Sequence, residues 1–338
     1  MTTPDTTPSM PTPPMTVDWS RLGHAYGPAI DTPGHLAALE FGDAEARKAA
    51  LDHLDMAVLH QGFPETATAP TVRAVTALLA EGRAHPDTVE SLLAFLGDAA
   101  SSVTDLSDDH YFAEILPDLA DAVAQAYPVV LPLLVASPPD RAPFRAENLV
   151  AIARMRSLAD RREELTTLIM EWSERAARTQ AEWLRCLGQL GVDLRDRFID
   201  PDPAVRLRAA LAHEDDARGR ELILAALAEP PPLEVHQFAL VAAALRVAAD
   251  FDEIATAACQ VASRDSWAGF DDGWGALVRF AFPEPYGTSR PLTEPQRALV
   301  RALVTNDELW DPTNGSCGLV FKQAGLPRSR SACRRLAG

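Results

Sequence analysis

Lysine is almost missing from this chain of 338 residues, because Lys48 and Lys322 are the only two and arginine supplies every other basic side chain. Lysine and arginine number 31 against 48 aspartates and glutamates, so the formal net charge is -17. Nucleic acids and anionic membranes are bound mainly through basic side chains, and the charge therefore disfavours both as partners. The acidity either keeps an alanine- and leucine-rich protein in solution or favours a basic protein partner.

Cysteine pairs, targeting signals and long apolar runs are also missing. The four cysteines form no CxxC pair, so we expect free thiols in a reducing compartment rather than a zinc framework or a disulfide scaffold. Residues 1–17 are rich in threonine and proline and contain no basic residue, which predicts a disordered tail rather than a signal or transit peptide. No apolar run reaches the roughly 18 residues that a membrane span needs. We therefore expect a cytoplasmic protein.

Motifs of catalysis and cofactor binding are not found either. The chain has no GxxxxGK[ST] phosphate loop and no GxGxxG turn, which disfavours nucleotide cofactors. The segment 314–318, Asn-Gly-Ser-Cys-Gly, resembles the surroundings of a papain-type nucleophilic cysteine. The catalytic histidine of that family lies downstream, however, and no histidine follows His236 here. We interpret the segment as a tight turn before a short helix, and we expect a protein that is not an enzyme.

A metal site also lacks a sequence signature. His53 and His60 lie seven residues apart with Asp52 and Asp55 nearby, so one helix face could carry both histidines. There is no HExxH motif and no third ligand at a suitable spacing. We expect neither a metal ion nor a cofactor, with His53 on a helix surface and His60 at a helix end.

Alanine and leucine, both strong helix formers, recur along the whole chain. Only 7% of the residues are aromatic, and no segment alternates polar and apolar residues in the manner of a strand. From about Leu36 onwards, amphipathic segments alternate with short breaks that contain Gly, Pro or Asp, and Asp43, Thr293 and Asp307 are candidate N-caps. This succession predicts an all-α solenoid of stacked antiparallel helix pairs.

Residues 200–212 carry a more specific pattern, Asp-Pro-Asp-Pro-Ala-Val-Arg-Leu-Arg-Ala-Ala-Leu-Ala. An aspartate-containing turn leads into Val-Arg, then small residues and leucine. This segment resembles the second-helix signature of a HEAT repeat, and a weaker copy surrounds Arg47. The resemblance implies that Asp200, Val205, Arg206 and Arg47 are structural residues of the repeats. It also implies that each of the two arginines pairs with an aspartate of an adjacent turn.

Two further segments support the same family. Residues 59–62, Leu-His-Gln-Gly, and 67–70, Ala-Thr-Ala-Pro, resemble a sequence that recurs in actinobacterial HEAT-repeat proteins of the armadillo type. That resemblance implies no activity. It predicts HEAT-like repeats over residues 18–265, followed by an aromatic-rich helical cap over 266–338 that ends in a basic tail.

Acidic residues are most segregated between Arg83 and Arg141, where no lysine or arginine occurs. Glu114, Asp118 and Asp121 are spaced to share one helix face, where their mutual repulsion needs compensation. The stretch is either a solvated outer face or a patch that attracts a cationic partner. For the second alternative, the candidate partner-binding residues are Asp105, Asp108, Asp109, Glu114 and Asp118.

The leading functional hypothesis is a protein–protein interaction scaffold that engages a basic partner, for example in an immunity-like or adaptor-like role. One alternative is a DNA-binding HEAT-like protein that resembles alkylation-repair glycosylases, for which Lys322–Arg335 is the one basic feature. Another is an enzyme that resembles phycobilin lyases, although no residue has an assignable catalytic role. A purely architectural subunit is the fourth.

Overall fold

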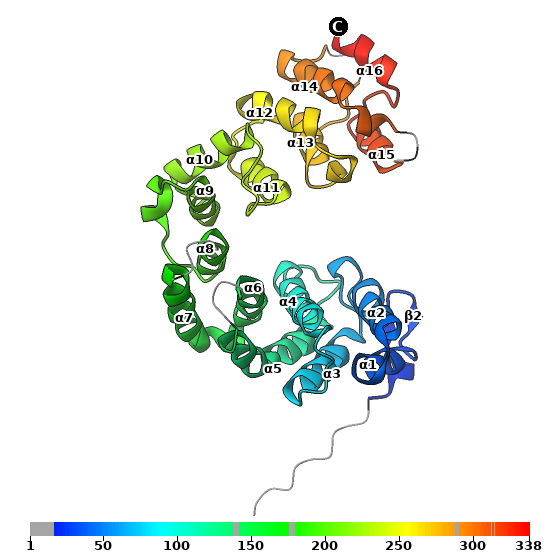
Figure 1. The fold of residues 1–338 in the computed structure, drawn as a ribbon. Coiled ribbons are helices and arrows are strands. Elements are labelled where there is room, and N and C mark those ends of the chain that lie inside the picture. The colour runs from blue at the N-terminus through cyan, green and yellow to red at the C-terminus, as the bar shows by residue number, and fades with distance from the viewer. Residues whose placement is uncertain (1–16, 138–141, 176–179, 288–290, 312, 314) are drawn as a thin grey trace, which may run out of the picture. The chain divides into compact units, whose positions relative to one another are not determined.

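The computed structural model describes residues 17–137, 142–175, 180–287, 291–311, 313 and 315–338. Within these ranges the sole strands are β1 (Gly23–His24) and β2 (Gly27–Pro28), which form a short antiparallel hairpin with Gly23 opposite Pro28. Helices make up the rest of the regular structure (Figure 1). The predicted all-α fold is confirmed. The chain divides into two compact units, Met1–Glu163 and Glu164–Gly338.

The first unit is a stack of neighbouring helices. Its helical elements are η1 (Trp19–Arg21), α1 (Thr32–Phe41), α2 (Ala44–His53), η2 (Leu54–Val58), η3 (His60–Gly62), α3 (Thr68–Ala80), α4 (Val89–Asp105), α5 (Leu116–Val135), α6 (Pro143–Ala153) and η5 (Arg156–Arg161). α1 packs on α2, α3 on α5, and α4 on both α5 and α6. Each helix thus contacts helices one or two places along the chain, which is the packing of a helical solenoid.

Helix α5 is the one described helix that is long and apolar enough to cross a membrane, with a mean hydropathy of 1.3. The expectation that no such segment exists was therefore wrong on length and composition. Leu119, Val123, Val130 and Leu134 of this helix have no exposed surface, and α3, α4 and α6 pack around it. The buried face of α5 thus belongs to the core of the first unit, and 39% of its apolar window is buried.

The second unit repeats the same neighbour packing. Its helices are α7 (Arg162–Arg175), α8 (Gln180–Gln189), η7 (Arg195–Ile199), α9 (Pro203–Ala212), α10 (Ala217–Leu227), α11 (Gln237–Val247), α12 (Phe251–Arg264), η8 (Trp267–Phe270), α13 (Trp274–Ala281), α14 (Glu294–Thr305), η9 (Asp307–Trp310), α15 (Gly315–Gln323) and α16 (Arg330–Ala337). α8 packs on α9, α10 on α12, α12 on α14, and α14 on α16. A stack of this kind buries one continuous core between successive layers.

The aspartate turn before α9 has the predicted position, but its residues have different roles. Asp202 is the N-cap, because its side chain accepts the N–H of Ala204 at 2.8 Å. Asp200 instead accepts the N–H of Asp202 at 2.9 Å. Val205 is buried with 1% of its surface exposed, as the repeat pattern predicts.

The two arginines of the repeat pattern differ from each other. Arg47 pairs with the carboxylate of Asp87, in the loop before α4, at 2.6 and 3.1 Å. Arg206 donates instead to the backbone carbonyls of Asp200 and Pro201 at 2.5 and 2.9 Å. The expected pairing with an aspartate therefore occurs at Arg47 and was wrong at Arg206, where the guanidinium stabilises the turn itself.

The aromatic residues of the C-terminal part form a small core of their own. Phe321 stacks on Trp310 at a ring-centroid distance of 4.7 Å and lies 5.8 Å from Trp274, which is fully buried. This cluster joins α13, η9 and α15 within the second unit. The predicted boundary near residue 266 stays a prediction, and the predicted tail, Val17 apart, lies outside the described residues.

Candidate functional site

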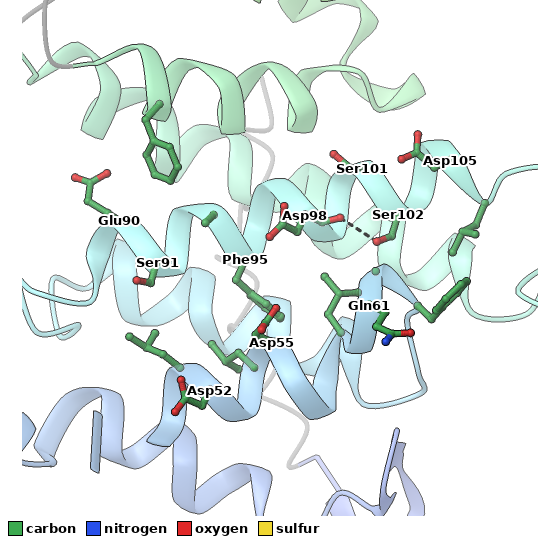
Figure 2. A pocket seen from close by; sticks show the side chains of 18 residues that line it. Asp52, Asp55, Gln61, Glu90, Ser91, Phe95, Asp98, Ser101, Ser102 and Asp105 are labelled. Carbon is green, nitrogen blue, oxygen red and sulfur yellow. Dashed lines mark hydrogen bonds between the residues drawn. The ribbon is translucent and has the colours of Figure 1, made fainter. Parts of the chain in front are cut away.

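A pocket of about 730 Å³ opens in the first unit between α2, η2, η3 and α4 (Figure 2). Its apolar floor comes mainly from leucine and phenylalanine side chains, including Leu54, Phe63, Phe95 and Phe144. Its carboxylates are Asp52, Asp55, Glu90, Asp98 and Asp105. No lysine or arginine is among the described residues that line it. We call this feature the acidic pocket.

The spacing along α4 explains the acidic wall. Glu90, Asp98 and Asp105 are separated by eight and seven residues, so they fall on one face of a helix with 3.6 residues per turn. Figure 2 shows them along α4, with Asp52 and Asp55 across the pocket. The opposite face of α4 carries leucines that are fully buried, such as Leu92 and Leu96. The hydrophobic core therefore fixes which way the acids point.

The other wall of the pocket has an irregular backbone. Helix α2 widens after His53 into the π-helical turn η2, in which the N–H of Leu59 donates to the carbonyl of Leu54 at 3.0 Å. Gln61 follows at φ 53°, and it is the one non-glycine residue with positive φ among those described. π-Turns and positive-φ residues often occur at functional sites, because such backbone persists only where the surroundings hold it.

Three of the pocket carboxylates have no counter-ion. Glu90 pairs with Arg145 at 2.5 and 2.9 Å, and Asp52 with Lys48 at 2.5 Å. Asp55, Asp98 and Asp105 have no ion-pair partner in the described part of the chain. Partial burial, together with the negative charge of Asp55, raises the pKa of Asp98 above its ordinary value. The pocket thus holds negative charge that a cation would stabilise.

The predicted acidic patch is only partly the same surface. Asp105 lines the pocket, whereas Asp108 and Asp109 lie in the turn after α4, where Asp109 accepts the N–H of Tyr111 at 2.8 Å. Glu114 precedes α5, which begins at Leu116. The expectation that Glu114 lies on one helix face with Asp118 and Asp121 was therefore wrong.

Asp118 is already paired. Arg73 of α3 donates to its carboxylate at 2.5 and 3.1 Å. These hydrogen bonds hold the pKa of Asp118 below its ordinary value, and the pKa of Arg73 is raised by the same bonds and by the charges of Asp118 and Asp121. The compensation that the sequence required comes from a neighbouring helix. Asp118 is thus a structural residue rather than a free binding group.

Four of the eight histidines gather beside the pocket wall, where the hairpin, α1 and the end of α2 meet. His24 Nε2 lies 3.0 Å from an oxygen of Asp31. His53 contacts the Thr32 hydroxyl at 3.0 Å, and its ring stacks on that of His35 at 4.1 Å. His24, Asp31 and His53 each offer one ligand atom, and the three atoms lie within 4.8 Å of one another.

His53 differs from its sequence-based interpretation, because it is buried with 9% of its surface exposed. Burial, with a smaller contribution from His35, lowers the pKa of His53 to about 4. His60 was predicted at a helix end and is the first residue of η3, two residues after η2 ends. It lies outside the group of His24, Asp31 and His53: its ring contacts Tyr26, and its Nδ1 lies 2.8 Å from the carbonyl of Met56. The two groups that join His53, and that no spacing along one helix revealed, are His24 of the hairpin and Asp31 of the turn before α1.

The four thiols lack the properties of nucleophiles. All four cysteines are free, and three are buried. Burial raises the pKa of Cys186 to about 12 and also raises that of Cys317, which is the opposite of thiolate activation. Cys317 lies inside α15, so the residues around it form the first turn of a helix rather than a tight turn before it. Asn314 lies outside the described residues.

No family model matches this chain, and comparisons with curated proteins and with solved structures found no match. The resemblance to HEAT repeats therefore stays a prediction.

Proposed function

We propose that this protein is a non-enzymatic, HEAT-like binding module whose first unit engages a basic protein partner through the acidic pocket. The observation that supports it is the set of unpaired carboxylates, Asp55, Asp98 and Asp105, around an apolar floor with no basic lining residue. This pocket replaces the predicted patch as the proposed site, with Asp105 common to both.

Charge complementarity is the physical basis of the proposal. Burial raises the pKa of Asp98, and the negative charge of Asp55 raises it further, so the two carboxylates repel each other. An arginine or lysine of a partner placed between them would relieve that repulsion and form charge-assisted hydrogen bonds. The surrounding acidity would also accelerate encounter with a cationic molecule, and more so at low salt.

The shape of the pocket defines the partner further. Its volume of about 730 Å³ lies within the range of sites that bind small ligands or a few side chains. Phe63, Phe95 and Phe144 offer aromatic contact area in the same lining as the carboxylates. A segment with one or two basic residues next to apolar ones, as on an amphipathic helix, would fit both features. Such a segment would belong to a cationic effector or an adaptor target, and the free thiols support a reducing, cytoplasmic location.

The test is an affinity capture from the natural host with mass spectrometry, using the chain tagged at its N-terminus. The pocket variant is Asp55→Asn, Asp98→Asn and Asp105→Asn combined. Its matched control is Asp108→Asn, Asp109→Asn and Glu114→Gln combined, which removes the same charge from residues outside the pocket lining. We expect the wild type and the control to retain one basic protein that the pocket variant loses.

Two results would count against the proposal. Equal loss with both variants would mean that net charge alone governs capture. Retention of the partner by both would mean that the pocket is not the binding site. Circular dichroism and thermal melts of all three proteins would establish that each is folded.

A further inference from the structure

Three separate segments bring donor groups together beside α2. His24 lies on β1, Asp31 in the turn before α1, and His53 at the last position of α2. The His24 side chain is 6% exposed and that of Asp31 is 51% exposed, so the group lies at the protein surface with an open side. A buried imidazole beside another imidazole and a carboxylate is a donor set for a transition metal.

The hairpin is fixed in place independently of any ligand. The N–H of Ala25 donates to the carbonyl of Ala57 in η2 at 3.0 Å. Both backbone polar groups of Gly23 are hydrogen-bonded to the segment before α3. Its N–H donates to the Thr66 hydroxyl at 2.8 Å, and its carbonyl accepts the N–H of Ala67 at 3.0 Å. These bonds hold His24 against α2, so the site is preorganised rather than assembled from loose chain.

From this geometry we propose that His24, Asp31 and His53 form a binding site for one divalent transition-metal ion, with Zn²⁺ as the best-suited ion. The proposal does not depend on the acidic pocket or on its partner. Zn²⁺ bonds of about 2.0 to 2.2 Å place tetrahedral donors roughly 3.3 Å apart. His24 Nε2 and Asp31 Oδ1, at 3.0 Å, already have nearly this spacing.

The remaining adjustment is small. All three donor atoms lie within 4.8 Å of one another, so side-chain rotations that move them by roughly 1.5 Å complete the set. The three ligands leave a fourth position for water or an external donor. Imidazole and carboxylate together favour zinc, cobalt, nickel or copper over calcium and magnesium, which prefer all-oxygen sites.

One proton has to move when the ion binds. The N–H of Tyr26 donates to Nδ1 of His24 at 3.1 Å, so in the metal-free protein Nε2 carries the proton that Asp31 accepts. On coordination Nε2 releases its proton to solvent and Nδ1 takes one up from solvent, so the ring stays neutral and the hydrogen bond from the Tyr26 N–H is lost. The Thr32 hydroxyl contacts Nε2 of His53 and the His35 ring stacks on it, so both orient the His53 imidazole and leave its Nδ1 for an ion.

The π-helical turn η2 lies directly beside the proposed site. It begins at Leu54, directly after His53, and its Ala57 carbonyl holds the hairpin. A metal ion that joins His53 to His24 and Asp31 would add a cross-link between the hairpin, the turn before α1 and the end of α2. The proposed role is therefore a structural clamp with an open coordination position.

The test uses the full chain, purified without a histidine tag and freed of metal with a chelator. Calorimetric titration with ZnCl₂ should give one site per chain, and saturation should raise Tm by at least about 3 °C. The site variants are His24→Ala and Asp31→Asn, which we expect to weaken Zn²⁺ binding by at least tenfold. Asp31→Asn is the second line of evidence if His24→Ala fails to fold, because the Asp31 side chain is half exposed.

The control is His110→Ala, which removes an exposed histidine of the same unit outside the cluster. Wild-type affinity in this control, loss in both site variants and no response to Ca²⁺ or Mg²⁺ would support the site. Equal weakening in His110→Ala, unchanged binding in Asp31→Asn, or several weak sites per chain would overturn it. A Co²⁺ complex with the visible absorption of four or five ligands would support the inferred geometry, and an octahedral spectrum would contradict it.

Discussion

The two compact units handle charge in different ways. In the first unit acidic side chains are about twice as numerous as basic ones, whereas in the second they exceed the basic ones by about a quarter. Acids of the second unit commonly pair with arginines of other elements, as in Arg246–Glu214 at 2.6 Å and Arg330–Asp307 at 2.6 Å. Asp55, Asp98 and Asp105 of the first unit lack such partners. A surplus of acid thus becomes a candidate site only where tertiary structure leaves it uncompensated.

The largest predicted effect is the loss of first-unit stability in acid. The pKa of His53 is lowered to about 4 in the fold, against an ordinary value of 6.5. The unfolded chain therefore takes up a proton that the folded chain does not, and stability is full above pH 6.5 and is lost as pH falls towards 4. The expected loss is on the order of 2 to 3 kcal/mol.

Urea denaturation of the metal-free protein at pH 7 and pH 4.5 measures this loss, with His53→Gln as the comparison. The variant should show a flatter dependence on pH between these values. An identical slope in both proteins would mean that His53 does not set the difference, and the acid sensitivity would then lie elsewhere in the chain.

The next effect concerns a buried arginine of the second unit. Arg208 is 9% exposed and donates to the carbonyl of Glu234, and burial together with Arg185 lowers its pKa to about 10. Arg208→Ala leaves a cavity and an unpaired carbonyl, and it should cost about 2 kcal/mol. Arg208→Met fills the same space without a buried charge and should cost less than about 1 kcal/mol. Chemical denaturation measures the free energy of unfolding of both variants. Equal losses in Arg208→Ala and Arg208→Met would mean that the volume of the side chain does not set the cost.

A smaller effect tests the paired acids of the first unit. Arg73→Met removes the partner of Asp118 and leaves Asp118 and Asp121 to repel each other. Because both side chains of the pair reach solvent, the expected loss is about 0.5 to 1 kcal/mol, and it should shrink at high salt. A loss that does not depend on salt would indicate that Arg73 acts by packing. Thermal melts at two salt concentrations provide the measurement.

The smallest predicted effect is a gain in stability rather than a loss. The raised pKa of Asp98 means that the fold favours its protonated form, so its contribution to stability is lost as pH rises above the ordinary value of 3.8. Asp98→Asn should therefore stabilise the protein at pH 7 by a few tenths of a kcal/mol and leave it unchanged near pH 3. Asp108→Asn, outside the pocket lining, is the matched control and should have no such pH-dependent gain.

Local elements were largely predictable from the sequence. Asp43 and Thr293 cap α2 and α14 as expected, and Thr293 forms a full capping box with Gln296. At the third predicted cap the structure uses Asn306 in place of Asp307. Caps depend on residues two or three places apart in the chain, and they can be recognised without tertiary information. The face of Glu114 was mispredicted because α5 begins two residues later.

The candidate sites were much harder to predict from the sequence. A regular spacing of acids from Glu90 to Asp105 was present as a signal for one wall of the pocket. The opposite wall depends on the π-helical turn after His53, and no residue pattern in the sequence predicts that turn. The histidine group joins positions 24, 31 and 53 through backbone hydrogen bonds of the hairpin. Spacing along one helix cannot reveal a ligand set drawn from three segments.

The sequence by itself determined the all-α class, the succession of short helices and the excess of acid, because helix propensity, capping and charge act within a few residues. Tertiary structure alone decided which acids are neutralised: Arg73 binds Asp118 from another helix, whereas Asp55 and Asp98 face each other without a cation. The tertiary structure also places His24 and Asp31 next to the buried His53. The physical reason is that Coulomb energies, desolvation and metal coordination depend on distances in space, which the core packing sets.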